Sequence, residues 1–242
     1  MPHVGLASGV TAVRGSIRDR GLVPTVRLVA AIVGGQLAFP VTRAVRRGRT
    51  FPFRGERLPY AIHRYNNTYR NERAVEIAIA TWFLSGTESG RVLEVGNVLA
   101  HYGVTGQTVV DKYEPASGVI NTDVVDYVPE RPFDTVVSIS TLEHVGWDED
   151  PREPEKVFRA FEAVRRCVAP GGRLLVTLPI GYNPTVDDAL RDGAWPFEQE
   201  TWLTRTTGRN DWRECDRDEA LACAYDSPFP AANALFIGVE PG

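Results

Sequence analysis

The sequence predicts an α/β fold in which a mostly parallel sheet carries helices on both faces. Short apolar segments typical of buried strands recur at residues 91–96, 107–113, 118–124, 133–140 and 173–180. Two segments have the apolar spacing of helices: residues 71–84 precede the first of these strands, and residues 153–168 lie between the last two. Strands that alternate with crossover segments form parallel sheets.

Each strand can be justified in turn. RVLEVG (91–96), QTVVDKY (107–113) and FDTVVSIS (133–140) have the dense apolar runs of strands that are buried on both faces. GVINTDV (118–124) is shorter, and RLLVTLPI (173–180) follows Pro170-Gly171-Gly172, which we expect to end the preceding helix. ALFIGVE (234–240) is a last apolar strand, and the rest of the chain after Asn183 is predicted to be irregular.

The organisation along the chain suggests an N-terminal extension, residues 1–70, before an α/β domain over residues 71–242. Residues 22–48 are predicted to be partly helical, with breaks at Gly34-Gly35 and Pro40. The uncharged run 28–41 is too short to span a bilayer, which takes roughly 20 residues. We expect it to pack on the domain or at a homodimer interface, and its basic flanks leave contact with a membrane surface as the weaker alternative.

Composition excludes several classes of protein. The formal net charge of −4 argues against a general nucleic-acid binder, although arginines crowd residues 14–54. Only Lys112 and Lys156 among the 27 basic residues are lysines. Cys167, Cys215 and Cys223 have no paired spacing, which predicts free thiols and a cytoplasmic location.

Polar residues follow the predicted strands at their carboxyl ends, where open parallel sheets bind ligands. Glu94, Gly96 and Asn97 close the first strand, Asp111 the second and Asp123 the third. A carboxylate in the place of Asp111 can accept hydrogen bonds from both hydroxyls of a ribose, and one in the place of Asp123 can accept from an adenine amine. The pattern therefore predicts an adenosine site.

The succession VLEVGN, VVDKY, NTDVVD, FDTVVSISTLEHVG and VAPGGRLLVTLPIG, between residues 91 and 181, resembles the class I S-adenosylmethionine-dependent methyltransferases. The resemblance covers roughly 40% of the chain, with its motifs in order. It implies a Rossmann-like fold with a seven-stranded, mostly parallel sheet and an antiparallel last strand, for which ALFIGVE is suited.

The same resemblance implies the roles of individual residues. Glu94 and Gly96 would hold the methionine part of the cofactor, Asp111 the ribose and Asp123 the adenine. In many relatives the segment before the first motif folds over the cofactor, so residues 1–70 are also expected to supply a lid. The remaining predicted cofactor contacts are Asn97, Lys112, Ser138, Tyr65 and Arg73.

The loop after the first strand departs from the family pattern. Many members have glycines where this chain has Val98 and Ala100. A dinucleotide enzyme would need G-x-G-x-x-G to bring the backbone close to a pyrophosphate, so that class is disfavoured. A methyltransferase needs this approach less. A non-catalytic relative that binds a partner or an anionic membrane through its arginine-rich N-terminal region remains the alternative of another class.

The candidate catalytic residues are His144 as general base and Glu143 as its orienting partner, because methylation of an alcohol requires removal of a proton. Glu143-His144 beginning a helix is the structural alternative. The acids Asp148, Glu149 and Asp150 would be compatible with a magnesium ion, but no spacing requires one.

The acceptor side is expected to use sequence particular to this chain. Its candidate residues are Tyr69, Tyr182, Asn183, Asp188 and Trp195. Aromatic rings beside acids suit a sugar or oligosaccharide, and looser resemblance points to the actinobacterial O-methyltransferases that make methylated mannose polysaccharides. A phenol or amine of a natural product is the alternative acceptor.

Overall fold

A computed structural model of the chain describes residues 39–86 and 90–242. The chain divides into two compact units, residues 1–47 and 48–242. In the first unit residues 39–46 are helical, and Pro40 lies at the start of the described part of this helix. The break predicted at Pro40 stays a prediction. Nearly all of the uncharged run 28–41 lies outside the described residues.

The larger unit begins earlier than the predicted boundary at residue 70. Residues 50–59 form a hairpin of β1 (Thr50–Phe53) and β2 (Glu56–Pro59). Phe51 and Phe53 of this hairpin are fully buried in a core that they share with helix α3 (Arg73–Ser85). Because these rings are part of the core, the hairpin belongs to the α/β unit and not to a separate extension.

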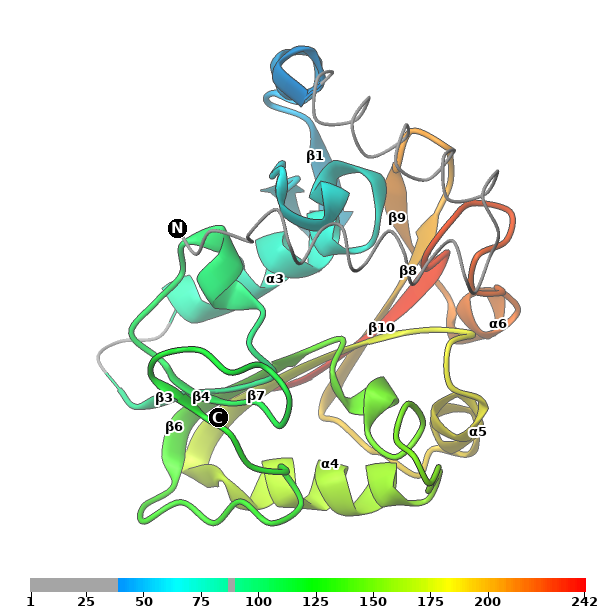
Figure 1. Cartoon of the computed structure of the whole chain (residues 1–242). Coiled ribbons are helices and arrows are strands. Elements are labelled where there is room, and N and C mark those ends of the chain that lie inside the picture. The colour runs from blue at the N-terminus through cyan, green and yellow to red at the C-terminus, as the bar shows by residue number, and fades with distance from the viewer. Residues whose placement is uncertain (1–38, 87–89) are drawn as a thin grey trace, which may run out of the picture. The chain divides into compact units, whose positions relative to one another are not determined.

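An eight-stranded sheet organises the larger unit, in the order β5-β4-β3-β6-β7-β10-β8-β9 (Figure 1). The strands are β3 (Val92–Val95), β4 (Thr108–Val110), β5 (Val119–Ile120), β6 (Phe133–Ile139), β7 (Val168–Pro179), β8 (Gln199–Arg205), β9 (Trp212–Cys215) and β10 (Ala234–Glu240). The strands from β5 to β7 pair in parallel, whereas β10 lies antiparallel between β7 and β8. The predicted Rossmann-like α/β fold is confirmed, with β9 added as an eighth strand.

Helices cover both faces of the sheet (Figure 1). Helix α3 packs on one face, and α4 (Lys156–Arg166) and α5 (Pro184–Asp192) pack on the other. Neighbouring residues of one strand therefore enter different cores. In β7, Leu174 joins the core of α4 and Leu175 that of α3. Burial on both faces explains why the central strands are continuously apolar.

The prediction of an irregular tail after Asn183 is wrong. This part of the chain contains α5, β8, β9 and α6 (Arg217–Leu221). Local signals for both helices are present: Asn183 caps α5 by accepting from the Thr185 N–H at 3.0 Å, and Asp216 caps α6 through the Glu219 N–H at 2.7 Å. Strands β8 and β9 contain many polar residues, so their sequences lack the apolar pattern by which a buried strand is recognised.

The connections between the first strands of the sheet are short and contain little helix. In residues 90–133, the crossover from β3 to β4 contains only the 3-10 helix η2 (Leu99–Tyr102), and no helix stands between β4 and β6. Two further 3-10 helices, η1 (Tyr65–Arg70) and η3 (Leu142–His144), flank the same end of the sheet. Helix α4 ends at Arg166, so β7 begins before the Pro-Gly-Gly turn that was expected to end the helix.

Candidate functional site

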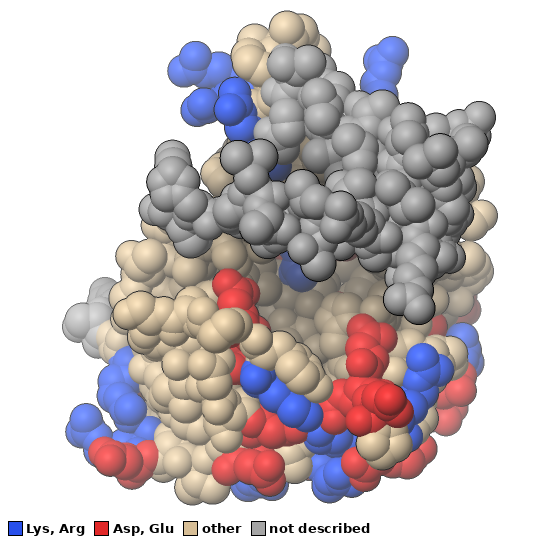
Figure 2. All heavy atoms as spheres, in the orientation of Figure 1, with Lys and Arg blue, Asp and Glu red and all other residues tan. Residues whose placement is uncertain are grey.

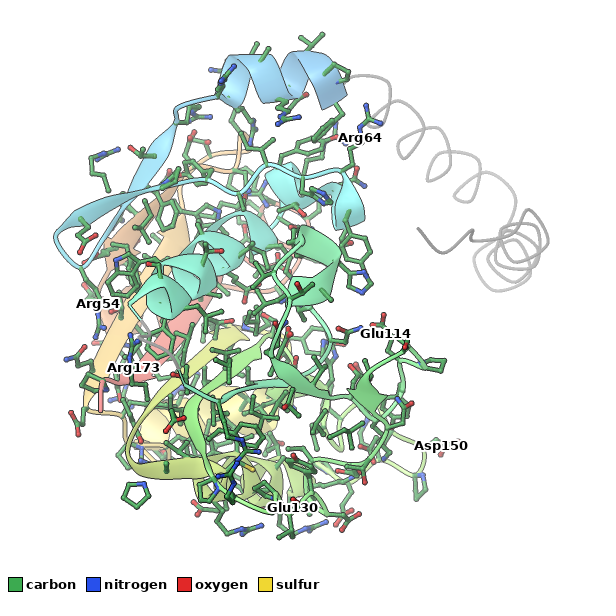
Figure 3. The ribbon with its side chains drawn as sticks, turned by 90° about the vertical axis from the view of Figure 1, so that its left-hand side faces the viewer. Arg54, Arg64, Glu114, Glu130, Asp150 and Arg173 are labelled. Atoms are coloured by element: carbon green, nitrogen blue, oxygen red, sulfur yellow. The ribbon has the colours of Figure 1, made fainter. Side chains whose placement is uncertain are left out.

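A cavity of about 650 Å³ lies at the carboxyl ends of β3, β4 and β6. Its walls are the loops after these strands, residues 95–98, 110–114, 122–124, 140–141, 144–145 and 148–149, with Tyr65 and Arg73 added from η1 and α3. Five carboxylates line it against two basic side chains, and acidic groups border the hollow in Figure 2. In Figure 3, Glu114 and Asp150 lie on one side of the unit and Arg54 and Arg173 on the opposite side.

Gly96 shapes the loop after β3. Its φ is +88°, and a Cβ placed there would lie 2.2 Å from Thr141 Oγ1. A side chain at this position is therefore excluded both by backbone conformation and by contact with the loop after β6. This single glycine brings the two loops together where the family pattern has several.

Glu94 supports the same loop from inside. It is fully buried, and its Oε1 accepts from the N–H groups of Val98 and Leu99 at 2.8 and 2.7 Å. Gln107 Nε2 donates to the other oxygen at 2.8 Å. Burial raises the pKa of Glu94 despite these donors. The carboxylate does not line the cavity, so any effect on a ligand passes through the loop.

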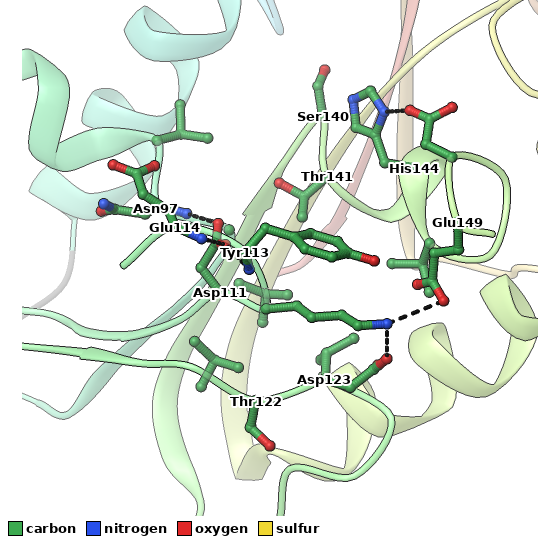
Figure 4. A pocket seen from close by; sticks show the side chains of 18 of the residues that line it. Asn97, Asp111, Tyr113, Glu114, Thr122, Asp123, Ser140, Thr141, His144 and Glu149 are labelled. Atoms are coloured by element: carbon green, nitrogen blue, oxygen red, sulfur yellow. Dashed lines mark hydrogen bonds and ion pairs between the residues drawn. The ribbon is translucent and has the colours of Figure 1, made fainter. Parts of the chain in front are cut away.

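Asp111 sits at the end of β4 as an ionised acceptor (Figure 4). Partial burial opposes its charge, but the N–H groups of Asn97, Glu114 and Tyr113 outweigh it and lower the pKa of Asp111. These donors lie at 2.8 to 2.9 Å and leave part of the acceptor capacity of the carboxylate unused. Its position and charge suit the predicted contact with a ribose.

Two more predicted cofactor residues contain buried oxygens with no hydrogen-bond partner in the described part of the chain, Asn97 Oδ1 and Ser138 Oγ. Asn97 lines the cavity, and its buried Oδ1 lacks a donor among the described residues. Ser138 is fully buried within β6 and does not line it. Ser140 and Thr141, at the end of the same strand, take the place expected for Ser138.

The only two lysines of the chain meet two acids beside the cavity. The two acids, Asp123 and Glu149, are labelled in Figure 4. Lys112 Nζ lies 2.9 Å from Asp123 Oδ2 and 3.1 Å from Glu149 Oε2, and Lys156 Nζ lies 2.5 and 2.6 Å from the same two oxygens. Partial burial opposes the charge of Asp123, but the two lysines lower its pKa. The predicted adenine acceptor is thus already engaged by two cations.

Arg73 joins α3 to the end of β6. Its guanidinium donates to the carbonyls of Ile139 and Ser140, at 2.9 and 3.3 Å, and pairs with the buried Glu76 at 3.1 Å. Glu76 also accepts from the Ser140 hydroxyl. These contacts hold Ser140 at a φ of +38°, and they leave Arg73 facing the cavity with 15% of its side chain exposed.

Tyr65 lies at the mouth of the cavity and stacks on His101, with ring centroids 4.1 Å apart. The His101 Nε2 lies 3.1 Å from Glu114 Oε1. Tyr65 therefore connects η1 to the loops after β3 and β4.

His144 follows β6 and lines the cavity with 46% of its side chain exposed. Its Nδ1 lies 2.5 Å from Asp148 Oδ2, whereas its Nε2 lies 3.5 Å from Glu143 Oε1. Asp148, and not Glu143, is the nearer carboxylate. Glu143 is almost fully buried, and burial raises its pKa well above the usual range.

The predicted acceptor residues are separated by the structure. Tyr182 donates to Asp148 Oδ2 at 2.6 Å and lies against His144, with ring centroids 4.8 Å apart. Asp188 is exposed and pairs with Arg191. Asn183 is fully buried, where it caps α5 and donates to the Glu143 carbonyl at 2.8 Å.

Two aromatic candidates for the acceptor side are core residues, which corrects their predicted role. Trp195 is 3% exposed and stacks on Phe161, with centroids 4.7 Å apart. Tyr69 is also 3% exposed and does not line the cavity. Aromatic side chains bury large apolar areas, so the packing of α4 and η1 takes both rings inward.

Sequence reasoning missed Tyr113, and it considered Asp148 and Glu149 only as possible ligands of a magnesium ion. Tyr113 is 69% exposed, yet its ring extends across the cavity (Figure 4). Asp148 resembles a solvated loop acid, although its spacing of four from His144 is a signal that was available. Glu149 pairs with Lys156, seven residues further along the chain, and with Lys112, which is distant in sequence.

In residues 39–86 and 90–242, no group of three or more histidine, cysteine or acidic side chains is arranged to hold a metal ion. Within the same ranges no helix has the length and apolar content needed to cross a bilayer.

No family model and no curated protein matches the chain. Solved structures with a similar fold include the N-methyltransferase NodS from Bradyrhizobium japonicum with S-adenosyl-L-homocysteine, at 14% identity, 69% coverage of this chain, 85% of that chain and a TM-score of 0.45. A possible histamine N-methyltransferase from Thermotoga maritima has 15% identity, coverages of 68% and 87%, and a TM-score of 0.42. A SAM-dependent methyltransferase from Archaeoglobus fulgidus has 14% identity, coverages of 73% and 98%, and a TM-score of 0.43.

Proposed function

We propose that the protein is an S-adenosylmethionine-dependent methyltransferase that acts on a hydroxyl of a sugar or oligosaccharide. One observation carries the cofactor assignment: the ionised Asp111 and the side-chain-free Gly96 meet at the carboxyl ends of β3 and β4, in a cavity of about 650 Å³. Its volume falls within the roughly 300–1,000 Å³ of small-molecule sites. The carboxylate suits ribose hydroxyls, and the glycine lets the loop after β6 close against the loop after β3 at the edge of the cavity.

The other side of the cavity suits the amino-acid part of the cofactor. Asn97 Oδ1 is a buried acceptor without a partner among the described residues, and an ammonium group would supply the missing donor. Arg73 faces the same cavity and can donate to a carboxylate. Asn97 and Arg73 thus offer groups of the charge and hydrogen-bonding type that an amino acid needs.

When bound, S-adenosylmethionine supplies a methyl group on a sulfonium; as the acceptor oxygen bonds to this carbon, the carbon–sulfur electron pair remains on sulfur. The chain has to align the acceptor and remove the hydroxyl proton. His144 lines the cavity, and its Nε2 is the ring nitrogen not bonded to Asp148. We assign the proton to His144 Nε2, and Glu143, buried behind it, has no direct contact with the cavity.

Calorimetric titration with S-adenosylhomocysteine tests the cofactor assignment. We expect binding by the wild type and at least roughly tenfold weaker binding by Asp111→Asn, since a hydrogen bond to a charged group contributes about 1.5–3 kcal/mol. Asp126→Asn is the matched control, because Asp126 is an exposed acid outside the cavity. A folded wild type that does not bind would refute the proposed function.

A second experiment tests the acceptor. Candidate methyl glycosides and phenols are incubated with the labelled methyl donor, and His144→Ala is compared with the wild type. Loss of transfer in the variant is expected for a sugar hydroxyl. A phenol ionises more readily and would retain more of its transfer. Transfer to phenols alone would refute the sugar assignment and leave the cofactor assignment intact.

A further inference from the structure

The nearest partner of His144 is a loop carboxylate four residues further along the chain. Asp148 Oδ2 lies 2.5 Å from His144 Nδ1, which is within hydrogen-bond distance. No hydrogen bond joins Nε2 to Glu143 in the described part of the chain, where the closest approach is 3.5 Å. Asp148 is therefore placed to decide which ring nitrogen carries the proton.

Asp148 is itself held from the acceptor side of the site. The Tyr182 hydroxyl donates to the same Oδ2 at 2.6 Å, and the Tyr182 ring stands nearly perpendicular to that of His144. Partial burial disfavours the charged form of Asp148. The hydrogen bonds with Tyr182 and His144 and the nearby charge of Arg152 outweigh this effect and lower the pKa of Asp148. Asp148 is thus an ionised acceptor with two donors.

The loop that carries Asp148 is anchored at both ends. The Asp148 N–H donates to the His144 carbonyl at 3.0 Å. The next residue, Glu149, accepts from Lys156 Nζ at 2.6 and 2.9 Å. Gly146 has a φ of +72°, and a Cβ there would lie 2.0 Å from the Glu153 carbonyl oxygen. These contacts fix the distance between Asp148 and His144.

We propose that Asp148 is the positioning residue of His144: its carboxylate takes the Nδ1 proton, so that the lone pair of Nε2 faces the cavity, and Tyr182 holds the carboxylate in place. This inference rests on the proposed function. In the reaction the hydroxyl proton passes to Nε2, and the imidazolium so formed is stabilised by the adjacent carboxylate. The arrangement serves an acceptor that must lose a proton, such as an alcohol.

The tautomer of His144 tests the proposal without a known acceptor. The full chain is labelled with ¹⁵N-histidine, and His144→Gln identifies the signals of His144 among the four histidines. At neutral pH the wild type is expected to show the Nδ1–H tautomer. Asp148→Asn should increase the Nε2–H fraction several-fold, Asp148→Glu should restore the wild-type tautomer in part, and Tyr182→Phe should have a smaller effect.

Asp150→Asn is the matched control, since Asp150 is an exposed acid of the same loop. Unchanged His63 and His101 signals show that each variant is folded. An Nε2–H tautomer in the wild type, or a tautomer unaffected by Asp148→Asn, overturns the proposal. Titration of the wild type with S-adenosylhomocysteine tests the proposed function separately, because this ligand binding is measured without any change to His144 or Asp148.

Discussion

Two parts of the cavity are held by different kinds of contact. The part formed by the loops after β3 and β4 is the proposed cofactor half, and the part lined by His144 and Asp148, with Tyr182 beside them, is the proposed acceptor half. In the cofactor half, Glu94 and Asp111 accept mainly from backbone N–H groups of the loops after β3 and β4. In the acceptor half, His144, Asp148 and Tyr182 contact one another through their side chains. Backbone donors are supplied by any sequence that forms the loop, whereas side-chain contacts need particular residues. The first half therefore tolerates substitution of the residues that donate to it, whereas the second half does not.

The largest effect is expected at Trp195, which was predicted for the acceptor side but lies in the core. Trp195→Ala should lower the free energy of unfolding by about 3–5 kcal/mol, because it removes a buried ring. Tyr113→Ala, which truncates an exposed ring lining the cofactor half, should change it by less than about 0.5 kcal/mol. Denaturant unfolding measures both. Equal values would contradict the placement of Trp195 in the core.

The ion cluster beside the cofactor half should contribute more than a surface pair. Lys156→Met leaves two partly buried carboxylates with Lys112 alone, and we expect a loss of about 3 kcal/mol. The control, Arg159→Met, breaks an ion pair whose side chains are about half exposed, and it should lose less than about 1 kcal/mol. Denaturant unfolding at low and high salt compares the two variants. A Lys156→Met loss as small as that of the control would show that the cluster does not stabilise the fold.

Two glycine variants separate the effect of the contact between the loops after β3 and β6 from the effect of backbone strain. Gly96 and Gly103 both have positive φ, but only at Gly96 would an added Cβ meet a neighbour. Gly96→Ala should therefore be less stable than Gly103→Ala by about 1–3 kcal/mol and should bind S-adenosylhomocysteine more weakly. Thermal unfolding and calorimetry provide the test. Thr141→Ala in the Gly96→Ala background should recover part of the loss, since it removes the two closest atoms.

The smallest effect concerns the buried carboxyl of Glu143. Its raised pKa means that the folded state binds the proton more tightly than the unfolded state. The resulting stability is complete below the unfolded pKa of about 4.3 and is lost as the pH rises through the folded pKa. Each tenfold difference in proton affinity contributes about 1.4 kcal/mol. Glu143→Gln, which stays neutral, should flatten this decline in denaturant unfolding across pH; an unchanged slope would show that Glu143 is ionised in the folded protein.

The alternation of apolar strands and crossovers predicted the α/β fold, and the strand ends predicted Gly96, Asn97, Asp111 and His144 at one cavity. The fold prediction is confirmed, and the structure brings these four residues to one cavity, because strand period and strand-end polarity are local properties of the sequence. The roles of the four residues stay predictions. Ser138 was placed two residues too early, because an apolar run does not reveal where the strand ends and the loop begins.

Other features were decided only by the tertiary structure. The packing of α4 on the sheet decides whether Trp195 faces an acceptor or stacks on Phe161. The carboxylate of Asp123 is engaged by Lys156, which lies 33 residues away in sequence. The partner of His144 likewise depends on the turn at Gly146 and on the anchoring of Glu149. The sequence by itself determined the sheet and the cofactor-side loops, because local backbone geometry produces them. The acceptor half required the tertiary structure, because contacts between distant side chains produce it.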